Sequence, residues 1–359
     1  MRKLAFPLLV LLSGLVLYWM GRAFRFYQHP DRVVWMLRAD WLSGDRPVDT
    51  LILGDSQAMS GLRPDVLGSE FGRIENLGLP SAQPEALLSV LSYLERHRVR
   101  TLIVNISPYS MYRTEVYDAF LNYYRSEWIS LRWPSPLQTG LYGDSGGEVL
   151  STLMAGLGLY RINGVIRNLS TDETLSMFVQ PGPFPGIGAA SNPNALALAP
   201  RFLESMRTLR LKNGNLQSIL SRTNGFWTWR DFRAPGEEQC DAASLKPLPA
   251  TIRFRPRPQA IEAWIEFLKR ASPHADRIFL VIIPFSDSWH ETVDRILPSG
   301  KVSLTVEKIA ERAHVGNLTV VGPPSDFSDK DFYDWNHLDY CGAARYSRWL
   351  KQRIAPQKK

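Results

Sequence analysis

The stretch VDTLILGDS, residues 48 to 56, indicates the fold class of this chain of 359 residues. Its apolar run stops at Gly54, Asp55 and Ser56. Such a short continuous run is typical of a strand that is buried on both faces of a parallel sheet. Four further runs of this kind lie at residues 73–79, 101–106, 277–284 and 317–321.

Segments with apolar residues at helical spacing separate these runs. We expect helices at residues 84–96, 259–270, 304–313 and 343–354, and a turn or helix at 58–69. Strands that alternate with helices predict an α/β fold. The expected architecture is a small doubly wound, flavodoxin-like fold, a five-stranded parallel sheet with helices on both faces.

Residues 114–255 break this alternation. The segment is rich in Pro and Gly, yet it carries an aromatic cluster, Phe226, Trp227, Trp229 and Phe232. A disordered linker is poor in aromatic residues, so we predict an ordered insertion after the third strand, where α/β folds place ligand contacts. For the cluster, and for Tyr109, Tyr112 and Tyr117, we favour core packing over stacking on sugar rings.

The amino terminus predicts a membrane anchor. Residues 4–20 contain no charge, and as a helix they would span roughly 25 Å. No good small-x-small cleavage site follows, so an uncleaved signal anchor is expected, with the bulk of the chain outside the cytoplasm. The expected regions are the anchor (1–27), a first core part (28–113), the insertion (114–255) and a second core part (256–359).

Composition excludes several classes. Lys plus Arg number 42 against 35 for Asp plus Glu, a net charge of +7 that favours anionic surfaces such as membranes. The chain shows no basic run with interleaved aromatics, no zinc spacing and no helix-turn-helix signal, so we expect no nucleic acid, metal or cofactor. Cys240 and Cys341 leave two alternatives open, one disulfide in an oxidising compartment or two unpaired thiols.

Two motifs are candidates for catalysis. Ser56 follows a strand directly, where a sharp turn can present a nucleophilic hydroxyl and backbone N–H groups can hold an oxyanion. Asp334 and His337 form a D-x-x-H motif, in which one loop supplies both a general base and the carboxylate that orients it. The alternatives are an N-cap serine and a capped turn. Both motifs follow predicted strands, so we favour the joint catalytic interpretation. Gln57 and Arg63 flank the serine, and we expect them to be solvated rather than to bind substrate.

The blocks LILGDSQAMSGLRP (51–64) and DWNHLDYCGAARYS (334–347) resemble those of the SGNH (GDSL-type) hydrolase superfamily. The resemblance is greater to its membrane-anchored extracytoplasmic branch, which includes DltD-like and alginate O-acetylation proteins. It covers residues 48–113 and 257–354 but not the insertion. It implies that Ser56 is the nucleophile and an oxyanion donor, His337 the base and Asp334 its orienting carboxylate.

The chain departs from this family at the oxyanion blocks. After Asn76 and Gly78, Ser81 stands where glycine is usual, and a dihedral angle reserved for glycine would be strained there. Asn105 lies one step too early, inside a strand, and we favour a buried hydrogen-bonded strand residue over a donor. The candidate oxyanion and substrate-binding set is Ser56, Gly78, Ser81 and Asn105.

The resemblance implies a serine O-acyltransferase of the bacterial inner membrane. We expect O-acetyl transfer to a cell-envelope or extracellular polysaccharide in the periplasm or extracytoplasmic space, with a membrane-bound O-acyltransferase as partner. The alternatives are an esterase or deacetylase of the same fold and a non-catalytic glycan-binding accessory.

Overall fold

The computed structural model describes residues 30–44, 46–113, 195–228, 240 and 254–355, with Leu12, Ser13, Leu15 and Val16 near the amino terminus. These four residues are helical. The rest of the expected anchor lies outside the described residues. Within the part that is described, no helix is both long and apolar enough to cross a membrane.

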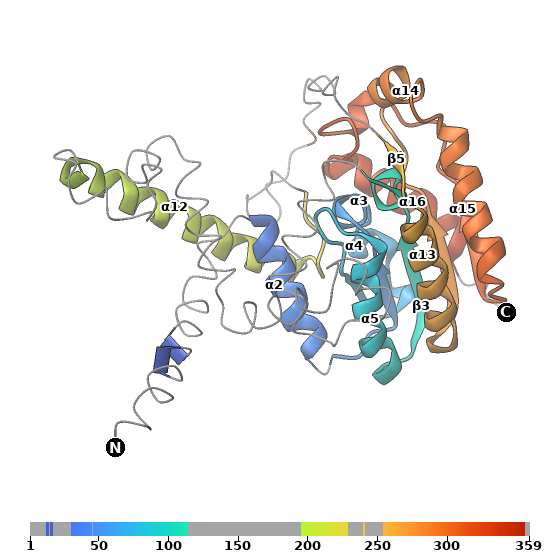
Figure 1. Ribbon diagram of the computed structural model, residues 1–359, viewed down its shortest axis with the longest axis horizontal. Coiled ribbons are helices and arrows are strands. Elements are labelled where there is room, and N and C mark those ends of the chain that lie inside the picture. Colours follow the sequence, from blue (N-terminus) through green and yellow to red (C-terminus); the bar gives the residue numbers. More distant parts are fainter. Residues whose placement is uncertain are drawn as a thin grey trace.

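Five parallel strands form the central sheet (Figure 1). They are β1 (Thr50–Leu53), β2 (Ile74–Asn76), β3 (Val99–Asn105), β6 (Ala275–Val281) and β7 (Leu318–Val321). Their order is β2-β1-β3-β6-β7, and every neighbouring pair is parallel. The predicted α/β class and the five-stranded parallel sheet are confirmed. This is one of the common doubly wound orders, and its direction reverses between β1 and β3.

Helices cover both faces of the sheet, because side chains of successive strand residues point to opposite sides. One core joins Leu51, Leu102 and Leu280 to several helices. They include α5 (Pro84–Arg96), α13 (Pro258–Ala271) and α15 (Ser299–Ala313). The opposite core joins Ile52 and Ile103 to a second set of helices. These are α3 (Ser56–Gly61), α4 (Pro64–Leu67) and α16 (Tyr340–Ile354).

Several helices were not expected from the sequence. They are α2 (Pro30–Ser43), α6 (Pro108–Met111), α12 (Ala195–Arg222), α14 (Asp287–Val293) and the 3₁₀ segments Ser69–Phe71, Ser272–His274 and Asp329–Asp331. The helix α12 contacts α2, and its far end extends away from the sheet (Figure 1). This helix lies within residues 114–255, for which we predicted an ordered insertion.

The two ends of the insertion lie side by side. A short antiparallel ribbon pairs β4 (Tyr112–Arg113) with β5 (Arg255–Pro256). The two segments that flank the insertion therefore meet close to the carboxyl end of β3. Of the predicted aromatic cluster, Phe226 and Trp227 are buried in the two cores, which supports packing over sugar stacking. Trp229, Phe232 and Tyr117 lie outside the described residues.

Candidate active site

Ser56 begins α3 directly after β1, and each residue of the turn has a local role. Gly54 has a φ of 144°, and a Cβ there would lie 2.9 Å from the Cβ atoms of Ala58 and Asn105. Only glycine fits this close approach. Asp55 caps the helix by accepting the backbone N–H of Gln57 at 2.9 Å. The turn thus fixes Ser56 at the carboxyl edge of the sheet.

His337 and Asp334 come from the loop that follows β7. The Oδ1 of Asp334 accepts the backbone N–H groups of Asn336 at 3.0 Å and of His337 at 2.8 Å, which closes the loop on itself. The His337 Nδ1 lies 2.9 Å from Asp334 Oδ2, and its Nε2 lies 2.8 Å from Ser56 Oγ. The three residues singled out in two distant motifs therefore form one hydrogen-bonded chain.

Two carboxylates at this site have pKa values that move in opposite directions. Burial tends to raise the pKa of Asp334, but the His337 charge and hydrogen bonds from His337 and two backbone N–H groups outweigh it and lower this pKa. Burial dominates at Asp55 and raises its pKa, against hydrogen bonds from Ser107, Gln57 and Asn105. The environment favours the ionised form of Asp334 and disfavours that of Asp55.

The four candidate oxyanion residues do not lie equally close to the cavity. Ser56 is the first residue of its helix, so its N–H has no intrahelical acceptor and can face a ligand. Ser81 lines the cavity with a φ of 59°, a left-handed conformation at a non-glycine residue. The N–H of Gly78 is used by Asn76 Oδ1 at 2.9 Å, and a Cβ at Gly78 would overlap the backbone of Met59.

Asn105 is a buried, hydrogen-bonded strand residue, which is the interpretation that we favoured from the sequence. It is the buried last residue of β3, and its Nδ2 donates to Asp55 Oδ1 at 3.2 Å. Ser107 donates its hydroxyl to the other Asp55 oxygen. Asp55, the residue before the nucleophile, therefore links the end of β1 to the end of β3. Asn105 does not line the cavity beside Ser56.

A cavity of about 220 Å³ opens beside Ser56. Its walls are formed by Asp55, Ser56, Ser81, Tyr109, Tyr333, Asp334, Trp335, Asn336 and His337. Four of these residues, Tyr109, Tyr333, Trp335 and Asn336, were not assigned to the site from the sequence. Three of the four belong to the D-x-x-H segment or adjoin it, and that adjacency was the available signal.

The expectation that Gln57 and Arg63 are solvated is wrong. Gln57 is 1% exposed, and its Nε2 donates to the Asn336 backbone carbonyl at 3.1 Å. Arg63 is 8% exposed, and its guanidinium lies 3.8 Å from the centre of the Tyr340 ring and donates to Tyr340 Oη at 2.7 Å. Both residues have partners in the second core part of the chain, and Arg63 also pairs with Asp65.

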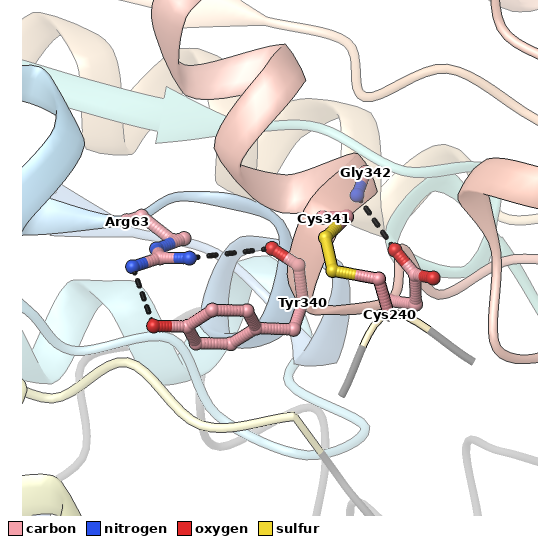
Figure 2. Close-up of a disulfide and its surroundings, with 6 residues drawn as sticks. Arg63, Cys240, Tyr340, Cys341 and Gly342 are labelled. Atoms are coloured by element: carbon pink, nitrogen blue, oxygen red, sulfur yellow. Dashed lines mark hydrogen bonds between the residues drawn. A yellow bond between two sulfur atoms is a disulfide. The ribbon is translucent and has the colours of Figure 1, made fainter. Parts of the chain in front are cut away.

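Cys240 and Cys341 are joined in a disulfide, which resolves the alternative left open above. Figure 2 shows the bond at the start of α16, next to the pair formed by Arg63 and Tyr340. Cys341 lies four residues after His337 in the sequence. The disulfide therefore ties the insertion to the helix that follows the loop of Asp334 and His337.

Within the described ranges, no group of three or more His, Cys, Asp or Glu residues is arranged to hold a metal ion. The geometry is that of a serine nucleophile with a histidine base and an orienting carboxylate. No protein-family model matches the chain, and no curated protein matches its sequence.

Proposed function

We propose that this protein is an SGNH-type serine O-acyltransferase. The observation that carries the proposal is the chain of hydrogen bonds from Ser56 through His337 to Asp334, 2.8 and 2.9 Å long. A serine hydroxyl is a weak nucleophile unless a base lies within hydrogen-bonding reach. The position of the site, where the strand order reverses, is also where doubly wound sheets bind ligands.

The reaction has two halves. Ser56 Oγ forms a bond to the acyl carbon of the donor while its proton moves to His337 Nε2. The oxyanion is held by the N–H groups of Ser56 and Ser81. When the donor C–O bond breaks, His337 returns the proton to the leaving oxygen. A second hydroxyl then attacks the acyl-enzyme and loses its proton to His337. The bond between the acyl carbon and Ser56 Oγ breaks as His337 returns that proton to Ser56 Oγ, which restores the free enzyme.

Whether the second hydroxyl belongs to a sugar or to water separates transferase from esterase. We propose transfer to a polysaccharide, in partnership with a membrane-bound O-acyltransferase, because the two sequence blocks resemble those of the extracytoplasmic branch. The disulfide between Cys240 and Cys341 supports an oxidising compartment outside the cytoplasm, such as the periplasm. The apolar residues 4–20 support an inner-membrane anchor.

Release of p-nitrophenolate from p-nitrophenyl acetate by the full-length protein in detergent tests this function. We expect an acetylated protein whose modified peptide contains Ser56, and faster turnover when a sugar acceptor is added. Acetylation without acceleration by any acceptor would favour the esterase. Unchanged polymer acetylation in cells that carry Ser56→Ala would favour the non-catalytic accessory.

A further inference from the structure

The cavity beside Ser56 has an unusual wall chemistry. Among the residues that the structure describes, its lining includes no Leu, Ile, Val, Met or Phe, and no Lys or Arg. A site for a long acyl chain would need aliphatic walls. A site for a phosphate or carboxylate group would need a cation or a cluster of N–H donors.

The charge that the cavity walls carry is negative, not positive. Asp334 lines the cavity, and its lowered pKa favours its ionised form, whereas Asp55, which also lines the cavity, has a raised pKa that favours its neutral form. A carboxylate on the substrate would meet this negative charge at short range, and among the described wall residues only His337, which is already paired with Asp334, could offset it. The walls therefore disfavour an anionic substrate next to Ser56.

Aromatic rings and one amide make up most of the remaining wall. The ring of Trp335 stacks on Trp289 with centroids 5.4 Å apart, and the ring of Tyr333 lies nearly parallel to His337 at 6.2 Å. Asn336 is 5% exposed, and its Oδ1 is buried without a hydrogen-bond partner among the described residues. A buried amide with an unmet hydrogen bond is costly unless a ligand or water completes it.

The backbone holds this amide in place from both sides. The N–H of Asn336 donates to Asp334, and its carbonyl accepts from Gln57. The preceding carbonyl, of Trp335, accepts from Ser286 Oγ at 2.8 Å. Trp335 and Asn336, which both line the cavity, thus lie on a loop that backbone hydrogen bonds hold in place, as a preorganised binding site requires.

We propose that this cavity is the subsite for one electrically neutral sugar residue, bound by the Asn336 amide and packed against Trp335 and Tyr333. Aromatic faces suit the C–H faces of a sugar ring, and an amide suits its hydroxyls. At about 220 Å³ the cavity is smaller than the pockets of about 300–1,000 Å³ that hold drug-sized ligands. The inference rests on the proposed function only for the reaction that follows binding.

Binding to the full-length Ser56→Ala protein tests the subsite without catalysis. The probes are neutral gluco-, manno-, galacto- and xylo-trisaccharides, compared with mannuronate and galacturonate trisaccharides by calorimetry and saturation-transfer NMR. We expect at least one neutral trisaccharide to bind about tenfold more tightly than every uronate. Adding Asn336→Ala or Trp335→Ala should weaken that binding about tenfold, since 1.4 kcal/mol corresponds to a factor of ten.

The matched control is Asn215→Ala, at an exposed position of α12, which should bind like the parent. The subsite would be overturned by preference for a uronate or by absence of binding by every neutral sugar. It would also be overturned if the Asn336→Ala and Trp335→Ala variants bound the sugar as tightly as the parent protein does. Sugar binding by a protein that p-nitrophenyl acetate does not acetylate would leave the subsite standing and refute the proposed function. Acetylation of Ser56 without sugar binding would refute the subsite and leave the proposed function standing.

Discussion

The side-chain amide of Gln57 donates to the backbone carbonyl of Asn336, across 279 positions of sequence. This bond joins the helix that carries Ser56 to the loop that carries His337. Each of the two segments is built by local interactions, but the Ser56–His337 distance depends on how they are held together. Gln57 is therefore a positioning residue for the pair.

Gln57→Met removes the donor and keeps a side chain of similar length. We expect acylation of Ser56 to slow about five- to tenfold, because one hydrogen bond contributes about 1 kcal/mol and its loss leaves the Asn336 carbonyl unpaired. Rates with p-nitrophenyl acetate and thermal melting of the same samples check this. Gln217→Ala, at an exposed position of α12, is the control. An unchanged rate in Gln57→Met would show that the bond does not position the pair.

Ser81 is held in a left-handed conformation, with a φ of 59°. This conformation costs an L residue roughly 1–2 kcal/mol, and glycine avoids the cost but loses roughly 0.5–1 kcal/mol of chain entropy. We expect Ser81→Gly to raise the free energy of unfolding by about 0.5–1 kcal/mol, measured by urea denaturation. Ser81→Ala keeps the strain and should not gain. Equal stability of the two variants would contradict a strained Ser81.

The lowered pKa of Asp334 predicts the sign of an acid effect. An unfolded Asp titrates near a pKa of about 3.9, and the folded Asp334 titrates lower. Its contribution to stability is therefore present above about pH 4 and is lost as pH falls through the folded value. Asp334→Asn should show a smaller loss of unfolding free energy in this acid range. It should also slow acylation on the order of 10³–10⁴-fold, because the imidazole tautomer is no longer fixed.

The raised pKa of Asp55 predicts a pH effect on stability that is opposite in sign to that of Asp334. Above about pH 4 the folded protein holds a proton that the unfolded chain releases, so this group destabilises the fold as pH rises toward the folded value. Asp55→Asn keeps an N-cap and should remove that decline. Unfolding measured from pH 3 to 8 compares both variants. Parallel curves for Asp55→Asn and Asp334→Asn would contradict the opposed shifts.

The disulfide closes a loop with a sequence separation of 101 residues. Replacing Cys240 and Cys341 together by Ser should lower the free energy of unfolding by about 2–4 kcal/mol. Thermal melts with and without a reductant check this, because reduction should destabilise the wild-type protein but not the double variant. Free thiols in the full-length protein purified under non-reducing conditions would contradict the pairing.

The sheet and its main helices could be predicted because their signals are local. The run of leucines after Pro84 predicts residues 84–96, and α5 has those bounds. The helix α12 was missed because Pro200 lies inside it, and proline normally ends a helix. The proximity of Ser56, His337 and Asp334 could also be predicted, since the strand-end GDS and the D-x-x-H loop each form within a few residues.

What the sequence did not indicate depends on partners that are distant in the chain. Gln57 and Arg63 look like surface residues until Asn336 and Tyr340 are brought beside them. Asn105 could be interpreted either way until its amide was seen to reach Asp55. The local pattern of apolar residues in the sequence predicts which apolar side chains are buried. It does not predict which buried polar side chains pair with each other.

Covalent labelling by a fluorophosphonate probe tests the central claim, that Ser56 is an activated nucleophile. The full-length protein in detergent, Ser56→Ala and the matched control Ser303→Ala would each be incubated with the probe and examined by intact mass. We predict one adduct on the wild type and on Ser303→Ala, and none on Ser56→Ala. A folded wild-type protein that stays unlabelled, or a Ser56→Ala variant that is labelled equally, would contradict the account.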